Sequence, residues 1–235
     1  MIRRLTLPLK NDTKEPMSRI IAIGDVHGCL DELNDLLERV SPTPQDRIVF
    51  LGDLINRGPN SSGVLKRVRS MPNAISILGN HELRLLRYDR TQDAGSLRDS
   101  DKKTIKGLNK KDWQFLRYNL IPYYYAPEYE TVFVHGGFAP GKPWYKQSAK
   151  TMCRTQVITP EGKAATRREC PDGTPWFDLW QGPPFVVYGH FRRTEVVERE
   201  YSIGIDTACI DGGHLTAYIL PEKKIVQVPA RMSYR

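Results

Sequence analysis

The sequence predicts an α+β protein with α/β-type layers, and three observations lead to this fold class. Short apolar runs, each followed by a glycine, recur in the first third of the chain. Segments with apolar residues at helical spacing separate these runs. Beyond residue 130, apolar runs of strand length dominate the chain. The first observation predicts strands, the second predicts the helices that connect them, and the third predicts a region built mainly of strands.

The first third of the chain is expected to alternate strands with helices. Strands are predicted at 19–23, 47–51 and 74–78, with helices at 29–40 and about 60–71. Asn60 and the two serines after it can cap the second helix. Strands and helices in this order imply a parallel sheet with crossover helices. Two more helices are expected at 82–88 and around Trp113 to Leu120, separated by a polar stretch at 89–103.

The second half of the chain is expected to consist mainly of strands. They are predicted at 131–134, 185–188, 202–205, 215–220 and 225–228. The segment 141–182 is rich in Pro, Gly and Lys, and we expect it to be an insert that forms a lid or a substrate wall. Residues 1–18 are expected to be a loosely ordered arm, with Met17 as an alternative start, and 19–235 one domain.

Composition limits the classes of protein to consider. A chain of 235 residues that is 40% hydrophobic can bury the core of one globular domain. No apolar run approaches the length of a membrane span, and the apolar patch at 5–9 is too short for a signal peptide. The net charge of +8 favours anionic partners. Because the charges are spread along the sequence, nucleic acid is expected only as a substrate end.

The four cysteines give no sign of a structural zinc site, because none forms a C-x-x-C pair. Cys153 and Cys170 flank a polar stretch and could form a disulfide. Free thiols in a reducing cytoplasm are the favoured interpretation, so we expect a cytoplasmic protein.

Polar residues follow five of the predicted strands. In open α/β sheets, ligands bind at the carboxyl ends of the strands, so these residues are expected to face one crevice. Carboxylate, imidazole and amide ligands together suit Mn, Fe or Zn better than Ca or Mg alone. One carboxylate can bridge two ions about 3.5–4 Å apart. The candidate metal ligands are Asp25, His27, Asp53, Asn80, His135 and His190.

Five motifs, taken together, resemble those of the calcineurin-like metallophosphoesterases and, within them, the phosphoprotein-phosphatase family. The resemblance implies a β-sandwich flanked by helices, with a dinuclear metal site at the strand ends. It covers nearly the whole chain except residues 1–18 and the insert. The motifs are Asp25-x-His27-Gly28, Gly52-Asp53-x-x-x-Arg57-Gly58, Gly79-Asn80-His81-Glu82, His135-Gly136-Gly137 and Gly189-His190.

The resemblance also implies a role for each site residue. Asp25 and His27 would bind the first metal, Asp53 would bridge, and the second metal would be bound by Asn80, His135 and His190. His81 would be the general acid for the leaving oxygen, and Arg57 would clamp the phosphoryl oxygens. The phosphate-binding set would be Arg57, Asn80 and His81. The cofactors would be two divalent ions, Mn first, with Fe, Zn or Ni as alternatives.

Two departures from the protein phosphatases narrow the expected function. Asn56 and Leu78 stand where those enzymes have Asp and Arg, as in the symmetrical diadenosine tetraphosphatases and ApaH-like phosphatases, although that branch more often has Asp at the position of Glu82. Asn56 would orient His81 without adding charge, so His81 should be hard to protonate. A phosphate leaving group, with a second pKa of about 6, needs that proton less than an alkoxide does.

We therefore expect a dinuclear metal-dependent phosphoesterase that hydrolyses phosphoanhydrides of nucleoside polyphosphates, with a water held between the two cations. The alternative is a serine/threonine or dual-specificity protein phosphatase of the same family. A non-enzymatic binding module is disfavoured because none of the six candidate ligands is missing from the sequence.

Overall fold

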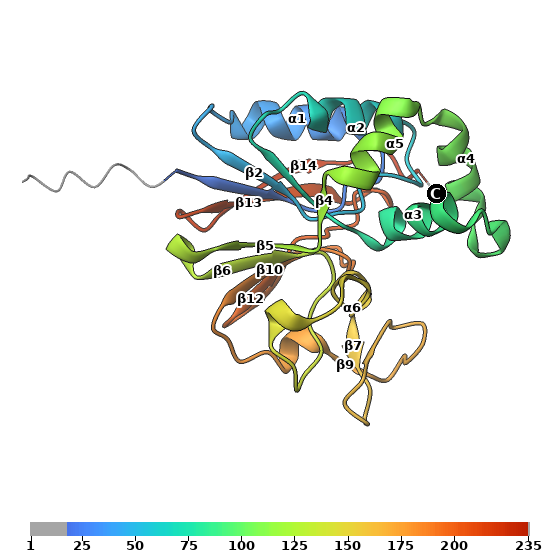
Figure 1. The fold of residues 1–235 in the computed structure, drawn as a ribbon. Helices are drawn as coiled ribbons and strands as arrows, with labels where there is room; N and C mark the ends of the chain where they lie inside the picture. Colours follow the sequence, from blue (N-terminus) through green and yellow to red (C-terminus); the bar gives the residue numbers. More distant parts are fainter. Residues whose placement is uncertain (1–17, 235) are drawn as a thin grey trace, which may run out of the picture.

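Two β-sheets packed face to face form the centre of the protein in the computed structural model, which describes residues 18–234 (Figure 1). One sheet has six strands in the order β14-β13-β1-β2-β3-β4, and the other has five in the order β11-β12-β10-β6-β5. Apart from Ser18, the predicted N-terminal arm lies outside the described residues. The strands of the first sheet are β1 (Ile20–Ile23), β2 (Arg47–Phe50), β3 (Ala74–Ile77), β4 (Leu120–Ile121), β13 (His214–Leu220) and β14 (Lys224–Pro229).

The first sheet is parallel where the sequence predicts crossover helices. β1, β2 and β3 pair in parallel, and the helices α1 (Leu30–Val40) and α2 (Ser61–Arg69) connect them. Both helices cover the outer face of the sheet, together with α5 (Lys110–Tyr118) (Figure 1). Side chains alternate across β1, so Ile21 and Ile23 pack against the helices while Ile20 and Ala22 face the second sheet.

The second sheet is covered on its outer face by the segment predicted as an insert. Its strands are β5 (Tyr123–Ala126), β6 (Thr131–Val134), β10 (Phe185–Tyr188), β11 (Val197–Arg199) and β12 (Ser202–Gly204). Phe133 of β6 points into the core between the sheets, whereas Val132 and Val134 point outward. There they join a cluster with Met152 and Trp176 from the segment 141–182. This segment contains α6 (Ala149–Arg154) and the short strands β7 (Val157–Ile158), β8 (Ala164–Ala165) and β9 (Thr174–Pro175).

The predicted secondary structure differs from the structure in several places, most of all at residues 89–103. The stretch 89–103 contains no periodic apolar face, yet the structure extends α3 (Asn80–Thr91) into it and adds a short 3-10 helix, Ala94–Ser96, and α4 (Asp99–Gly107). Capping and ion pairing stabilise α4, because Asp101 accepts from the backbone N–H of Arg98 and pairs with Arg84. Leu120 belongs to β4 and not to the helix before it, and the sequence did not predict β5 and β11.

The sequence raised the possibility of a disulfide, and the structure also bears on whether a helix could span a membrane. All four cysteines are free, so Cys153 and Cys170 do not form the disulfide considered above. Within residues 18–234, none of the helices combines the length and the apolar character that crossing a membrane requires.

Candidate metal centre

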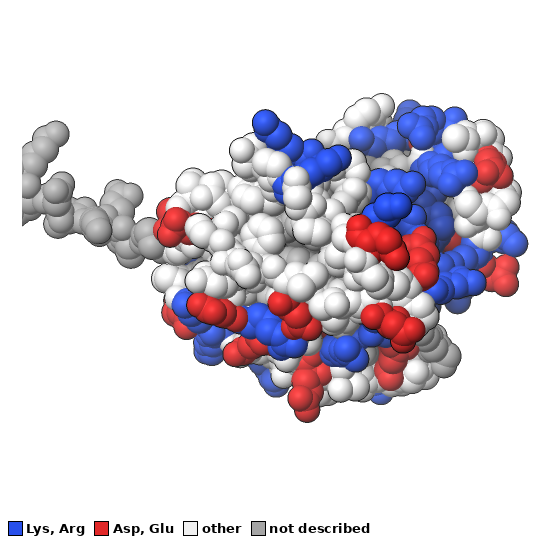
Figure 2. Space-filling view, turned by 90° about the horizontal axis from the view of Figure 1, so that it is seen from below, with Lys and Arg blue, Asp and Glu red and all other residues white. Residues whose placement is uncertain are grey.

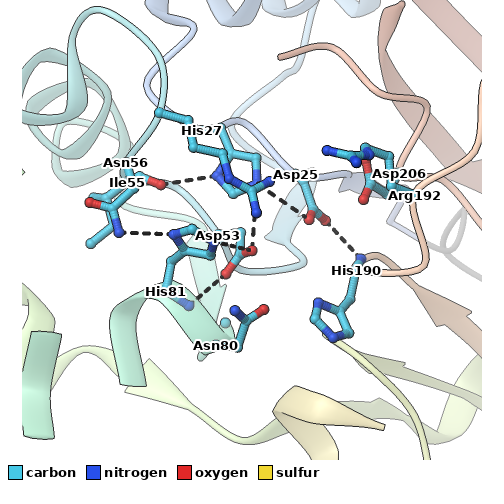
Figure 3. Close-up of polar contacts among 12 residues, drawn as sticks. Asp25, His27, Asp53, Ile55, Asn56, Asn80, His81, His190, Arg192 and Asp206 are labelled. Atoms are coloured by element: carbon cyan, nitrogen blue, oxygen red, sulfur yellow. Dashed lines mark hydrogen bonds and ion pairs between the residues drawn. The ribbon is translucent and has the colours of Figure 1, made fainter. Parts of the chain in front are cut away.

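The six candidate ligands lie together at the ends of strands from the two sheets. Figure 3 labels five of them, Asp25, His27, Asp53, Asn80 and His190. Asp25 and His27 follow β1, Asp53 follows β2, and Asn80 begins α3 directly after β3. His135 follows β6 and His190 follows β10, two strands that also run parallel to each other. Parallel strands end at the same edge of a sheet. The polar residues that follow the strands of the two sheets therefore lie close together.

Asp53 lies at the centre of the cluster. Its Oδ2 is 3.6 Å from Nε2 of His27, and its Oδ1 is 3.4 Å from Nε2 of His135. Asp25 joins the first of these imidazoles, with 4.0 Å between its Oδ2 and Nε2 of His27. Two groups able to hold a metal share Asp53: one consists of His27, Asp53 and His81, and the other of Asp53, His135 and His190. This arrangement suits a carboxylate that bridges two ions.

Hydrogen bonds fix the tautomers of two imidazoles in the form that binds metal. Nδ1 of His27 donates to the carbonyl of Ile55 at 3.0 Å, and Nδ1 of His135 donates to the carbonyl of Leu51 at 2.8 Å. Nε2 of each ring therefore turns a lone pair toward the cluster. Burial lowers the pKa of His27 to about 3 and that of His190 to about 3, so both rings are neutral at neutral pH.

In the second group, nitrogen and oxygen atoms that could each donate an electron pair to a metal lie close together. No hydrogen atom lies between them. Nε2 of His135 is 3.0 Å from Oδ1 of Asn80 and 3.4 Å from Oδ1 of Asp53. Nε2 of His190 is buried and has no hydrogen-bond partner in the part of the chain that the structure describes. Burial, followed by the charges of Asp206 and Asp53, raises the pKa of Asp25 well above its usual range. A divalent cation would satisfy all of these groups, so the residues fit a metal site.

The backbone around the cluster is held in unusual conformations. Five of the ten described non-glycine residues with positive φ are His27, Asp53, Asn56, Arg57 and His190. Backbone strain of this kind persists where the surrounding contacts impose it, and it is concentrated at functional sites. Gly189 allows a close approach, because a Cβ there would lie 2.2 Å from Oδ1 of Asp25.

His81 lies beside Asp53 and presents its two ring nitrogens to different surroundings (Figure 3). Nδ1 is 2.9 Å from Nδ2 of Asn56 and 3.0 Å from Nη2 of Arg84. Both neighbours are N–H donors, so Nδ1 must accept and the ring proton resides on Nε2. Nε2 is 3.9 Å from Oδ2 of Asp53 and is buried without a hydrogen-bond partner among residues 18–234. The free N–H of His81 therefore faces the candidate metal centre.

Asp101 of α4 determines this arrangement. Its Oδ1 accepts from Nδ2 of Asn56 at 2.7 Å and from Nη2 of Arg84 at 2.8 Å, while its Oδ2 accepts from Nε of Arg84 at 2.6 Å. The amide nitrogen of Asn56 must face the carboxylate, which leaves its second N–H for His81. Asp101 is fully buried, so this contact is strong and directional.

Arg57 and a small group of further residues complete the wall of the centre. Nη1 of Arg57 is 2.9 Å from Nε2 of His27, the nitrogen that a metal would use, so metal binding requires this guanidinium to turn away. A pocket of about 110 Å³ lies in front of the cluster. Four of the residues that line it have no role predicted from the sequence, namely Gln156, Arg167, Arg192 and Asp206.

Comparison with known proteins agrees with this geometry. The family model described as calcineurin-like phosphoesterase matches residues 18–219, which is most of the chain. The chain belongs to the calcineurin-like phosphoesterase family. It is therefore a hydrolase of phosphoester or phosphoanhydride bonds, and its family uses a dinuclear metal site.

Relatives of this phosphoesterase carry two related names. A protein of Halalkalibacterium halodurans named bis(5'-nucleosyl)-tetraphosphatase PrpE [asymmetrical] is 32% identical over 89% of this chain and 93% of its own. A symmetrical bis(5'-nucleosyl)-tetraphosphatase of Dechloromonas aromatica is 30% identical over 88% of this chain and 94% of its own. A crystal structure assigned to a diadenosine tetraphosphatase is 31% identical, covers 91% of this chain and 94% of its own, and superposes with a TM-score of 0.81.

The structure adds two charged groups to the surroundings of His81 that the sequence did not indicate. Asn56 was expected to orient His81 without adding charge, and the carboxylate of Asp101 and the guanidinium of Arg84 are present as well. Burial lowers the pKa of His81 well below its usual value, Asp53 opposes this effect, and His27, Arg57 and then Arg84 add to it. His81 is hard to protonate, as expected, but Asn56 is not the main reason. Because α4 was not predicted, no signal in the sequence pointed to Asp101.

Asp206 could have been found from the sequence. It follows the apolar strand β12, so the rule that identified the other strand-end residues applies to it as well. Arg167 and Arg192 carried no such signal, because isolated arginines are common on protein surfaces.

Asp101→Asn is expected to lower kcat of this phosphoesterase about 10- to 100-fold and to change KM by less than about twofold. Without the carboxylate, the amide of Asn56 can turn its oxygen toward His81 and draw the ring proton to Nδ1. Steady-state kinetics measure the loss, and the ¹⁵N chemical shifts of the His81 ring report the tautomer. Asp99→Asn, an exposed change on the same helix, is the control. An unchanged tautomer in Asp101→Asn would contradict the positioning role.

Glu82 has a structural function in this phosphoesterase. Its carboxylate is fully buried and accepts from the backbone N–H groups of Asp53 at 2.9 Å, Gly79 at 3.0 Å and Ile55 at 3.2 Å. It thereby ties the loop after β2 to the loop after β3. Burial, with a smaller contribution from Asp53, raises the pKa of Glu82 to about 8, although hydrogen bonds from backbone N–H groups, those of Ile55 and Asp53 among them, act in the opposite direction.

Glu82→Ala should lower the free energy of unfolding by about 3–5 kcal/mol, because three buried N–H groups lose their acceptor. Urea unfolding monitored by circular dichroism measures the change. Glu38→Ala, an exposed change on α1, should stay within about 0.5 kcal/mol of the wild type. Equal stabilities of Glu82→Ala and Glu38→Ala would show that the loops do not depend on this carboxylate.

Proposed function

We propose that this phosphoesterase hydrolyses phosphoanhydride bonds of nucleoside polyphosphates such as diadenosine tetraphosphate. The observation that carries the proposal is the environment of His81, whose Nδ1 accepts two N–H bonds and whose ring is therefore neutral. A neutral imidazole offers a hydrogen bond to the leaving oxygen but does not readily give up its proton. A phosphate leaving group needs no more than this, whereas a serine alkoxide does. The names of the relatives support the same substrate class.

The proposed roles follow the geometry of the cluster. Asp25 and His27 would hold one ion, Asp53 would contact both, and the other ion would be held by Asn80, His135 and His190. Two divalent ions, when bound, would polarise the phosphoryl oxygens and activate a water. Mn is the proposed metal, with Fe, Zn or Ni as alternatives, because the donor set mixes imidazoles with oxygen ligands.

The remaining roles belong to side chains beside the metals. Arg57 would bind phosphoryl oxygens through its planar fork, assisted by Asn80, and His81 would donate Nε2–H to the leaving oxygen. The free thiols of all four cysteines support a cytoplasmic location.

Removal of metal is expected to lower activity at least about 100-fold, and added Mn is expected to restore it. The guanidinium of Arg57 contacts Nε2 of His27, but a guanidinium cannot replace divalent ions that polarise phosphoryl oxygens and activate a water. The measurement is hydrolysis of diadenosine tetraphosphate after chelation and dialysis, followed by titration with Mn, Fe, Zn and Ni. Full activity in a sample shown by elemental analysis to hold no metal would refute the dinuclear mechanism.

A substrate panel tests the substrate class. The ratio of kcat/KM for diadenosine tetraphosphate to that for a phosphoserine peptide should strongly favour the anhydride, measured with Mn at one pH. Because both substrates share the same enzyme sample, the ratio is independent of metal occupancy. A ratio that favours the phosphopeptide would support the protein phosphatase alternative instead. Product analysis assigns the cleaved bond, since symmetrical and asymmetrical enzymes are similar to this chain.

A further inference from the structure

A second, larger cavity opens beside the metal pocket. It is a cleft of about 1040 Å³, and it shares Arg57, Asn80, Gln156 and His190 with the small pocket in front of the metal cluster. One wall is formed by α3 and the turn before α4, and the other by α6 and the residues after it, up to Glu169. The cleft is therefore continuous with the place where the scissile phosphoryl group would bind.

The walls of this cleft are strongly basic. They carry seven arginines and Lys150 against a single carboxylate, Glu169. Figure 2 shows Lys and Arg side chains gathered at the end of the molecule where α3 and α4 lie. Most of the cleft cations come from two separate segments of the sequence, 84–98 and 150–168, and the fold brings these segments together.

Most of these cations form no ion pair with a carboxylate among residues 18–234. Arg84, Arg87 and Arg154 form ion pairs with acidic side chains. Within residues 18–234, no such pair is formed by the remaining cleft cations outside the metal pocket, which are Arg90, Arg98, Lys150 and Arg168.

Arg98 and Arg168 belong to opposite walls of the cleft. Burial and then the neighbouring arginines, Arg168 among them, lower the pKa of Arg98. Cations that repel one another across a cleft become favourable when an anion lies between them.

The cleft offers little to a nucleobase. No Phe, Tyr or Trp lines it in the described part of the chain, and Leu83 is its single apolar side chain. Stacking on an aromatic ring is the usual way to hold a base without reading its edges. The cleft therefore matches the phosphate chain of a substrate better than its nucleosides.

We propose that this cleft binds a linear chain of phosphates that extends beyond the phosphoryl group at the metals, with Arg98 and Arg168 holding it from opposite walls. The inference rests on the proposed function, because it extends the same substrate from the metal pocket into the cleft. With such a cleft, the enzyme would select its substrate by the length of the phosphate chain and not by the base. Long-chain inorganic polyphosphate should then bind without any nucleoside.

The first test compares two inorganic substrates, tripolyphosphate and long-chain polyphosphate, with Mn at low ionic strength. In the double variant Arg98→Ala/Arg168→Ala, KM for the long chain should rise about tenfold, while kcat/KM for tripolyphosphate stays within about twofold of the wild type. The control is Lys66→Ala/Lys224→Ala, which removes two exposed charges that do not line the cleft. An equal loss on both substrates, or no loss on the long chain, would overturn the proposal.

The second test needs no hydrolysis. Calorimetry measures the binding of long-chain polyphosphate to Asp53→Asn, and adding Arg98→Ala and Arg168→Ala to that variant should raise Kd about tenfold. If the wild type hydrolyses no anhydride but this dependence remains, the proposed function fails and the cleft proposal stands. A Kd for polyphosphate that is unchanged by the two arginine substitutions would overturn the cleft proposal. Tighter binding of a single-stranded RNA than of polyphosphate would also overturn it.

Discussion

Asp53→Asn is expected to lower kcat on diadenosine tetraphosphate about 1000-fold, the largest effect of any single substitution in this protein. Asp53 faces His27 with one oxygen and His135 with the other, so it belongs to both groups that can hold a metal. An amide at this position has one oxygen and no charge with which to hold two cations. A factor of 1000 corresponds to about 4 kcal/mol of activation free energy, within the contribution expected of a two-metal centre.

The loss should appear in metal content as well as in rate. Elemental analysis of purified Asp53→Asn should find fewer bound ions than in the wild type, while circular dichroism shows a folded protein. Asp46→Asn is the matched control, because Asp46 is buried and pairs with Arg19 away from the metal cluster. Near wild-type turnover in Asp53→Asn would exclude the bridging role.

His81→Ala is expected to reduce turnover by an amount that depends on the leaving group. The ring offers an N–H from Nε2 toward the metal cluster, because Asn56 and Arg84 occupy Nδ1. This hydrogen bond matters most where the departing oxygen is basic. We expect a loss of about 100- to 1000-fold on an alkyl phosphate and of about tenfold or less on an activated aryl phosphate.

The comparison of leaving groups removes changes in folding and metal occupancy, which affect both substrates equally. His214→Ala is the control, since His214 is exposed and lies outside the metal cluster. Equal losses on the two phosphates would show that His81 does not assist the leaving oxygen.

The sequence alone predicted which residues lie together at the candidate metal centre. A polar residue directly after a buried parallel strand must lie at the carboxyl edge of the sheet, so Asp25, Asp53 and Asn80 were predictable from local pattern. The same rule placed His135 and His190 at the edge of the second sheet. Strand ends are local features, and a local pattern is enough to find them. The roles of these residues remain predictions.

The tertiary structure alone decided how His81 is held. α4 has no apolar stripe, and it depends on a buried carboxylate, Asp101, whose partners Asn56 and Arg84 lie 45 and 17 residues away in the chain. Contacts of this kind are formed between side chains of separate elements. They leave no periodic pattern in the sequence, so the expectation about Asn56 was incomplete.

The basic cleft also depends on the tertiary structure. The sequence showed a net charge of +8 with Lys and Arg spread along the chain. Only the packing of the segment 141–182 onto the second sheet places Arg168 opposite Arg98. The number of charged residues is set by the sequence, but the positions of their side chains in space depend on long-range packing. The chemistry at the strand ends could therefore be predicted from sequence, whereas the surroundings that select a substrate could not.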